Sequence, residues 1–220
     1  MKSKVLCVIP ARYGFTRLPD KPLLEIKALP LVMWAYNRAV ESGVFNRVCV
    51  ATDDQRIAST VERFGGETVM TSASHQRGTD RVCEAAGKTD CTHIVNLQGD
   101  KPDVPLGILR DFVSALTRID DLSLLTLVSN VTIKEVGSPH AVKAVLGAFG
   151  DALYFSRAVI PFDRDRGGRT FYKHHGIYGF TREELLRFCG LPPGEPRAAA
   201  CIGVWDECQM RCQRFHIRKN

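Results

Sequence analysis

The sequence lacks any long hydrophobic run. Its first apolar run, residues 5–9, follows two lysines and is shorter than the roughly 7–15 apolar residues of a secretion-signal core. No stretch approaches the roughly 20 apolar residues that a membrane-spanning helix needs. The sequence therefore predicts no membrane insertion, and we expect a cytoplasmic protein.

Paired cysteine spacings and blocks of one charge sign are also missing. The eight cysteines are scattered, and Cys7 and Cys49 fall inside apolar runs, where a thiol acts as a small hydrophobe in a reducing compartment. The 30 Lys/Arg and 24 Asp/Glu residues are mixed along the chain, without a basic stripe interleaved with aromatics. These patterns argue against a disulfide framework and against nucleic acid as a partner. A steep salt-dependent affinity for oligonucleotides would instead favour nucleic acid as a partner.

What the first half of the chain does contain is an alternation of short apolar runs with segments of helical spacing. The apolar runs lie at residues 4–9, Arg47–Thr52 and His93–Leu97, and the helical spacing lies at Leu31–Ser42 and 53–64. Short runs bounded by loop signals are typical of strands buried on both faces of a parallel sheet. The pattern predicts an α/β sheet with right-handed crossovers, whose ligands bind at the carboxyl ends of the strands.

The second half is predicted to be richer in strands. Residues 151–160 and 170–180 have extended patterns, and a helix over 181–188 begins with Thr181 and has Glu184 three positions later, which is a capping box. Gly43 and Gly65 are predicted to end the two earlier helices. Without internal repeats or a low-complexity linker, one domain is the simplest arrangement.

The loop after the first predicted strand carries three cations, Arg12, Arg17 and Lys21. Arginine matches phosphate with two parallel hydrogen bonds, and lysine acts as a mobile point charge, so a triphosphate is a suitable ligand. The alternative is an ordinary solvated basic loop, because a single basic loop is a weak signal.

An acidic residue follows the third predicted strand, in N-L-Q-G-D. Asp100 stands at the rim of the sheet, where its oxygens can hold Mg²⁺ and leave the other positions of the metal to phosphates. The alternative for Asp100 is a helix cap or a turn.

Seven motifs in order carry a resemblance to a known family. They are V-I-P-A-R-Y-G-F-T-R-L-P-D-K-P-L, V-A-T-D-D-Q-R-I, F-G-G-E-T-V-M-T-S, H-Q-R-G-T-D-R, V-N-L-Q-G-D, A-L-Y-F-S-R-A-V-I-P and K-H-H-G-I-Y-G-F. Together they resemble the 3-deoxy-manno-octulosonate cytidylyltransferases, the CMP-KDO synthetases of lipopolysaccharide assembly, over residues 4–193. The resemblance implies a Rossmann-like nucleotidyltransferase fold with helices on both faces of a mostly parallel mixed sheet, and a homodimer.

The resemblance also implies a reaction in which CTP and KDO give CMP-KDO and pyrophosphate with Mg²⁺. The anomeric hydroxyl of the sugar acid attacks the α-phosphorus in line, and catalysis is mainly positioning and charge neutralisation, without a covalent enzyme intermediate. The roles implied for residues of this sequence are as follows: Arg12, Lys21 and Asp100 for catalysis, with Asp100 also the metal ligand; Ala11, Arg12, Arg17, Lys21, Gly78 and Thr79 for CTP; and Arg81, Gln98, Arg157, His174 and Tyr178 for the sugar acid. For His174, a partly buried strand histidine is the alternative.

Several positions depart from the family pattern. Phe15 stands where the family has serine, Asp20 where it has glycine, and Lys101 where it has the glutamate after the metal aspartate. Phe15 removes a hydroxyl from the phosphate loop, Asp20 adds strain if that glycine has positive φ, and Lys101 places a cation near the metal. Each change is expected to weaken nucleotide or metal binding.

The segment from residue 194 to 220 does not follow the family. Residues 197–220 hold half of the net charge of +6, with five Lys/Arg and two Asp/Glu. Cys201, Cys208, Cys212 and His216 are residue types that zinc prefers, but their spacing fits no common zinc site. The other interpretation is a shifted reading frame. Permitted codons for R-A-A-A-C-I-G-V-W-D-E, read one nucleotide later, give E-Q-L-R-V-L-E-S-G-M, which matches the helix that the family has here. We therefore expect residues 1–193 to form the cytidylyltransferase domain and 194–220 an atypical tail.

Loss of that helix, and of the glutamate and second metal aspartate associated with it, would impair activity. Two alternatives stay open: a cytidylyltransferase for a related acid, 8-amino-KDO or a sialic acid, and a non-catalytic remnant that binds nucleotide only.

Overall fold

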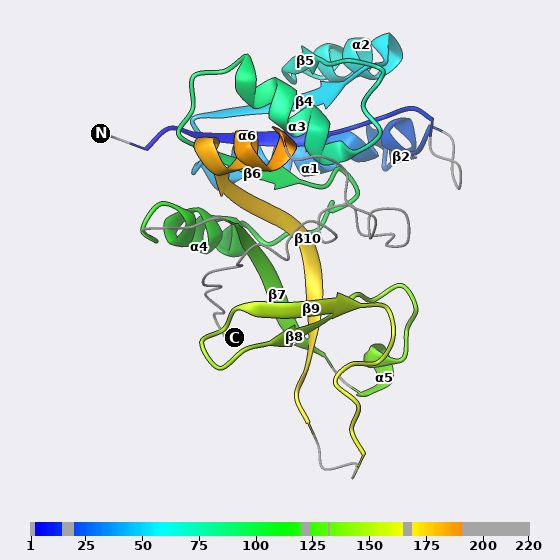
Figure 1. Cartoon of the computed structure of the whole chain (residues 1–220). Coiled ribbons are helices and arrows are strands. Elements are labelled where there is room, and N and C mark those ends of the chain that lie inside the picture. The colour runs from blue at the N-terminus through cyan, green and yellow to red at the C-terminus, as the bar shows by residue number, and fades with distance from the viewer. Residues whose placement is uncertain (1–2, 15–19, 120–123, 132, 165–168, 191–220) are drawn as a thin grey trace. The chain divides into compact units, whose positions relative to one another are not determined.

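The structure is a computed structural model that describes residues 3–14, 20–119, 124–131, 133–164 and 169–190. Its contacts divide the chain into two compact units (Figure 1). Unit 1 is Met1–Ile119 with Gly179–Pro193, and unit 2 is Asp120–Tyr178 with Gly194–Asn220. The predicted domain boundary near residue 193 and the tail beyond it lie outside the described residues, so both stay predictions.

Unit 1 is built on parallel strands. β1 (Val5–Pro10) pairs with β4 (Arg47–Thr52) on one side and β6 (His93–Leu97) on the other, and β4 pairs with β5 (Thr68–Met70). Beyond β6 the sheet continues into β10, the strand at Phe171–Thr181. The three strands that the apolar runs predict are confirmed, because their side chains are buried on both faces.

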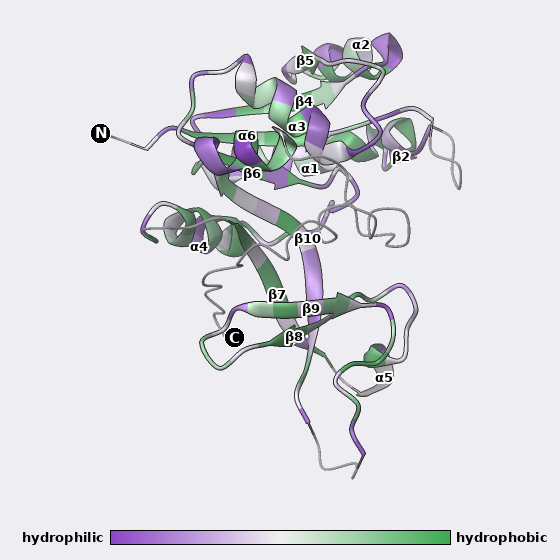
Figure 2. Cartoon of the chain, viewed as in Figure 1, coloured by the Kyte–Doolittle hydropathy of each residue, from purple (hydrophilic) through white to green (hydrophobic). Residues whose placement is uncertain are grey.

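Helices cover both faces of this sheet. They are α1 (Leu31–Ser42), α2 (Gln55–Arg63), α3 (Gly78–Gly87), α4 (Leu106–Leu116) and α6 (Arg182–Gly190). α1 packs against α4 and α3 against α6, and in Figure 2 the central strands are mostly green while α2 and α3 show both purple and green sides. The α/β class with a Rossmann-like arrangement is therefore confirmed.

The ends of the first two helices follow their local sequence. α1 ends at Gly43, which has φ 70, as predicted. α2 begins later than the predicted residue 53, because the Asp54 side chain accepts a hydrogen bond from the Arg56 amide and acts as its N-cap. Gly65, with φ 78, follows the C-cap Phe64, as predicted.

Between β1 and α1 lie three short elements. These are the 3₁₀ turn η1 (Lys21–Leu23) and a hairpin of β2 (Glu25–Ile26) and β3 (Leu29–Pro30). They connect the cationic loop to the first helix.

Unit 2 is antiparallel, which agrees with the prediction of a strand-rich second half. It contains β7 (Leu125–Val131), the short helix α5 (Ile133–Val136), β8 (Lys143–Leu146), β9 (Ala152–Ser156) and most of β10. β8 pairs antiparallel with β9 and β10, and β7 pairs with β10. β9 stops at Ser156, earlier than the extended pattern over 151–160 suggests.

The capping box predicted at residue 181 is half formed. The Glu184 amide donates to Thr181 Oγ1 at 3.3 Å, which satisfies one free donor at the start of α6. The Glu184 carboxylate instead accepts a hydrogen bond from Arg187 at 2.6 Å.

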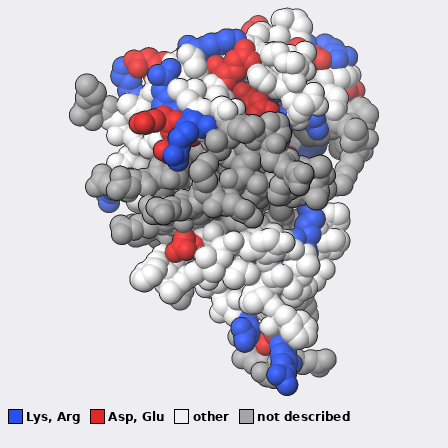
Figure 3. Space-filling model, in the orientation of Figure 1, with Lys and Arg blue, Asp and Glu red and all other residues white. Residues whose placement is uncertain are grey.

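The described cysteines are all free thiols, in agreement with the predicted lack of a disulfide framework. Burial raises the pKa of the Cys7 thiol, and it raises that of Cys49 to about 12. Among the helices that the structure describes, none has the length and apolar character needed to cross a membrane. On the face shown in Figure 3, acidic and basic side chains are mixed over unit 1.

Candidate active site

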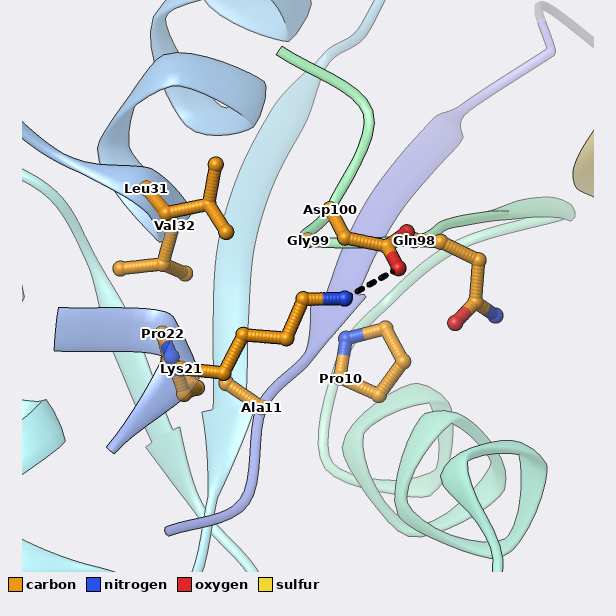
Figure 4. Close-up of a pocket in the computed structure, with 9 residues that line it drawn as sticks. All are labelled: Pro10, Ala11, Lys21, Pro22, Leu31, Val32, Gln98, Gly99 and Asp100. Atoms are coloured by element: carbon orange, nitrogen blue, oxygen red, sulfur yellow. Dashed lines mark hydrogen bonds and ion pairs between the residues drawn. The ribbon is translucent and has the colours of Figure 1, made fainter. Parts of the chain in front are cut away.

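A pocket open to solvent lies in unit 1 at the carboxyl ends of β1 and β6 (Figure 4). This is where an α/β sheet is expected to bind ligands. The loops after both strands and the start of α1 line it: Pro10, Ala11, Lys21, Pro22, Leu31, Val32, Gln98, Gly99 and Asp100.

Lys21 and Asp100 meet across this pocket. Lys21 Nζ lies 2.6 Å from Asp100 Oδ2, and their side chains are 31% and 47% exposed. η1 carries the lysine and the turn after β6 carries the aspartate, so the fold joins two motifs that are far apart in sequence. A carboxylate and an ammonium open to the same pocket are suited to a ligand that carries phosphates and a cation.

The backbone of both loops is packed closely. The amide of buried Ala11 donates to Ala51 O at 2.9 Å, which fixes the start of the cationic loop. At Gly99, an added Cβ would lie 3.4 Å from Ile9 Cγ2, so a side chain has little room. The Lys101 amide donates to Gln98 O at 3.2 Å, which closes a turn around Asp100. Asp100 therefore lies in a turn, as its alternative interpretation predicts. Its carboxylate nevertheless lines the pocket.

Of the other two predicted cations of this loop, the structure describes only one. Arg12 follows Ala11 directly and is exposed. Arg17 and the departing residue Phe15 lie outside the described residues.

Asp20, which stands where the family pattern has glycine, adopts the left-handed conformation with φ 61 and ψ 10. This is the positive φ for which the sequence predicts strain. A hydrogen bond with Asp20 raises the pKa of Tyr13, and the Arg56 guanidinium carbon lies 3.3 Å from the centre of the Tyr13 ring. Tyr13 therefore ties the loop to the start of α2 through a cation–π contact.

Three predicted site residues lie on α3. An added Cβ on Gly78 would lie 3.4 Å from Pro10 Cγ, so the start of α3 approaches the end of β1 closely. Thr79 is buried, and its carbonyl is 3.9 Å from Cys189 Sγ. Arg81 is 3% exposed and donates to Asp53 Oδ2 at 2.6 Å and to Thr71 Oγ1 at 2.9 Å. These contacts make Arg81 part of the framework that holds the start of α3, and its contact with a sugar acid stays a prediction.

The predicted sugar-acid residues Arg157, His174 and Tyr178 belong to unit 2. Arg157 Nη1 donates to Pro139 O at 2.9 Å. His174 is 8% exposed, its Nε2 lies 2.9 Å from Thr126 Oγ1, and its ring centre is 5.4 Å from that of Tyr178. His174 is thus a buried histidine of β10, more buried than the partly buried strand histidine of the alternative, and its hydrogen-bonding role toward substrate stays a prediction.

A family model described as cytidylyltransferase matches residues 6–213. The chain belongs to the cytidylyltransferase family. The match extends into the segment after residue 193, which is outside the described residues, and the frame-shift interpretation stays a prediction.

Two curated relatives of this cytidylyltransferase carry the same name. The 3-deoxy-manno-octulosonate cytidylyltransferase of Thermodesulfovibrio yellowstonii is 42% identical over 202 residues, covering 85% of this chain and 79% of that protein. The Escherichia coli protein of the same name is 39% identical over 200 residues, covering 91% of this chain and 81% of that protein.

A solved structure of CMP:2-keto-3-deoxy-manno-octonic acid synthetase in complex with CTP is also similar. It is 34% identical, has a TM-score of 0.89, and covers 99% of this chain and 90% of that chain. A 4-diphosphocytidyl-2C-methyl-D-erythritol synthase from Anaerococcus prevotii, at 12% identity and a TM-score of 0.60, shares the fold.

The residues of the pocket fit a loosely held divalent cation better than a dedicated metal cage. Within the described ranges no group of three or more His, Cys, Asp or Glu side chains could hold a metal ion. Mg²⁺ is typically bound by one or two carboxylates together with substrate phosphates, and Asp100 can provide one such carboxylate. The cysteines and the histidine of the zinc alternative lie outside the described residues.

Sequence reasoning missed two features near these residues. One is the Tyr13–Arg56 contact described above. The other is Lys143 in unit 2, whose side chain is fully buried. The signal for it was present, since Lys143 is the only charged residue in the run A-V-K-A-V-L.

Proposed function

We propose that this cytidylyltransferase transfers CMP from CTP to 3-deoxy-D-manno-octulosonate, giving CMP-KDO and pyrophosphate for lipopolysaccharide biosynthesis. The observation that carries the proposal is the similarity to the CTP-bound synthetase, at 34% identity and a TM-score of 0.89. The Lys21–Asp100 pocket at the strand ends has the chemistry that a nucleoside triphosphate requires.

The cations of the first loop would bind the triphosphate. Arg12, Arg17 and Lys21 would neutralise the phosphates, and Lys21 would move from Asp100 toward an incoming phosphate oxygen. Gly78 and Thr79, with the backbone at Ala11, would lie beside the cytidine. The attack is then in line on the α-phosphorus, and holding both reactants in position lowers its barrier.

Asp100 would hold Mg²⁺ through a carboxylate oxygen. The metal would supply charge neutralisation on the phosphates when bound. Lys101 is the next residue in sequence and brings a positive charge near the proposed Mg²⁺ position. Because like charges repel, we expect weaker metal binding than with the glutamate of the family pattern.

The sugar acid would be recognised by groups that match its carboxylate and hydroxyls. The guanidinium of Arg157 would bind the carboxylate, while Gln98, His174 and Tyr178 would hydrogen-bond the hydroxyls, with help from Arg81.

We also infer a cytoplasmic homodimer. Unit 2 exposes large apolar side chains that a monomer would leave in water, namely Phe149 at 88%, Phe162 at 81%, Leu153 at 63% and Tyr154 at 62%. Exposed apolar side chains in this number support an interface with a second copy.

The test is Mg²⁺-dependent pyrophosphate release from CTP with KDO, 8-amino-KDO or a sialic acid as acceptor. Faster release with KDO supports the proposal, and faster release with another acid supports the alternative acceptor. Binding of CTP without release from any acceptor would favour the non-catalytic remnant.

A second arm compares the 220-residue chain with a version whose reading frame is restored after Pro193. If only the restored version turns over, the lost segment is essential to the reaction. If both do, the described pocket is sufficient and our view of the tail is wrong.

A further inference from the structure

Lys143 is a charged residue in the interior of unit 2. It begins β8, and its side chain has no exposed surface. Burial lowers the pKa of its ammonium, as does the nearby charge of Arg157. In the part of the chain that the structure describes, no carboxylate pairs with it. A buried ammonium without a counter-ion needs another form of compensation.

Backbone carbonyls provide that compensation. Lys143 Nζ donates to Ala141 O at 2.8 Å, to Ser138 O at 3.0 Å, and to Arg157 O in a short hydrogen bond. The three N–H groups of an ammonium are thereby all used. The carbonyls come from the turn before β8 and from the residue after β9, so Lys143 joins two segments that no sequence pattern connects.

Arg157 is held at its backbone by Lys143 of β8 and at its guanidinium by the turn before β8. Its carbonyl accepts from Lys143, and its guanidinium donates to Pro139 O at 2.9 Å. β8 and β9 are paired so that Lys143 lies opposite Ser156, the residue before Arg157. The strand pairing therefore delivers the Arg157 backbone to the ammonium, and the ammonium fixes it there.

We propose that Lys143 is a positioning residue for the sugar acid, acting by fixing the backbone of Arg157. The inference rests on the proposed function, in which the Arg157 guanidinium binds the acid's carboxylate. Lys143 is buried and does not touch substrate in this scheme. Since a bidentate guanidinium contact depends on orientation, a loosened Arg157 backbone weakens acid binding and leaves CTP binding unchanged.

The kinetic test compares Lys143→Met with Lys173→Met, each made in the wild-type chain and in Arg157→Ala. Lys173 is the matched control, because it is the lysine opposite Lys143 on β10. We expect Lys143→Met to lower kcat/KM for the acid by roughly tenfold through KM, and to change KM for CTP by less than about twofold. In the Arg157→Ala background the same substitution should have almost no further effect.

Two kinetic outcomes would overturn the proposal. One is an equal loss toward CTP and the acid, which is the signature of general destabilisation. The other is full additivity with Arg157→Ala, which would mean that Lys143 acts independently of Arg157. If Lys143→Met does not fold, Lys143→Gln, which retains amide donors, is measured in the same way with the same expectation.

A readout without turnover separates this proposal from the proposed function. Hydrogen–deuterium exchange is followed in peptides that cover residues 137–142 and 155–160. Faster exchange in both peptides for Lys143→Met, but not for Lys173→Met, supports the tether to Arg157, and unchanged exchange overturns it. If the wild-type chain turns over none of the three acids, the proposed function fails, and the exchange result still decides whether Lys143 fixes Arg157.

Discussion

At the scale of single residues, the pocket depends on one ion pair between two loops. The Lys21–Asp100 pair is partly exposed, so solvent screens it and its contribution to folding stability is expected to be below about 1 kcal/mol. The pair is therefore better suited to binding a ligand than to holding the fold together.

Substitutions at this pair should separate activity from stability. We expect Lys21→Ala and Asp100→Asn each to lower kcat/KM for CTP by about 100-fold or more, because the first removes a positive charge that faces the phosphates and the second removes the carboxylate proposed to hold Mg²⁺. Thermal unfolding should change little. The control is Lys4→Ala, which removes another exposed lysine–aspartate pair of unit 1, with Asp90, and should retain full activity. Equal losses in all three variants would contradict this role of the pocket.

A second residue-scale prediction concerns Glu84 on α3. Its carboxylate accepts from Lys88 Nζ at 2.6 Å and from the Ser72 amide at 2.9 Å, and it lies 2.6 Å from His75 Nε2. The Lys88 hydrogen bond, followed by that of Ser72, lowers the pKa of Glu84 from 4.5 to about 2. Because the folded pKa is the lower one, this stabilisation is present above pH 4.5 and is lost as the pH falls toward 2.

Glu84→Gln should therefore lower the free energy of unfolding by about 1–2 kcal/mol at neutral pH, after allowance for solvent screening. The difference from wild type should shrink below pH 4.5, as followed by denaturant unfolding across pH. Glu41→Gln, on an exposed pair with Arg38 at 3.4 Å, is the control and should have a smaller effect. A difference in the free energy of unfolding that does not vary with pH would contradict the lowered pKa of Glu84 as the source of this stabilisation.

At the scale of elements, α4 and the end of β10 pack with little free space at Gly179. An added Cβ there would lie 2.9 Å from Leu116 Cδ1 and 3.0 Å from Phe112 Cε1. Both side chains are buried, so neither can move away freely. The absence of a side chain at this position allows helix and strand to approach.

Gly179→Ala is expected to destabilise unit 1 by about 1–3 kcal/mol through overpacking. The matched control is Gly107→Ala in α4, where an added Cβ meets nothing within 4 Å. That substitution should be neutral or stabilising, because alanine is the better helix former. Thermal unfolding of both variants provides the measurement, and an equal change in the two would argue against steric crowding at Gly179.

Elements differ in how well the sequence predicts them. β1, β4 and α1 have strong apolar periods and clear ends, and their predicted positions are correct to within a residue. α3 begins at Gly78 without a side-chain cap, and α4 begins after Pro105, so local signals do not reveal them. Both helices depend on packing against the rest of unit 1, which a single sequence does not display.

The residues of the candidate site also differ in how well the sequence predicts them. Lys21 and Asp100 could be predicted to share a rim, because parallel strands end at the same edge of a sheet. The apolar run around Lys143 signals its burial, but its three carbonyl partners could not be predicted, because they depend on a turn and on the register of β8 with β9. Long-range backbone contacts of this kind have no signature in local residue patterns.

At the scale of the whole molecule, the exposed apolar side chains of unit 2 lead to a prediction about assembly. We expect the wild-type chain to sediment as a dimer and the double variant Phe149→Ser/Phe162→Ser to sediment as a monomer, because both side chains are more than 80% exposed. Phe64→Ser, at a residue of unit 1 that is 38% exposed, is the control and should remain dimeric. A monomeric wild-type chain in analytical ultracentrifugation would contradict the inferred dimer.

The division of unit 1 into Met1–Ile119 and Gly179–Pro193 has a consequence for synthesis on the ribosome. When β6 has emerged, its neighbour β10 has not yet been translated, so one edge of the nascent sheet stays unpaired. At about 5–20 residues per second, that edge waits on the order of 3–12 s while the residues between the two parts are made. The nascent chain thus passes through a period in which the sheet of unit 1 has a bare strand edge, and a chaperone that binds such edges can act on it.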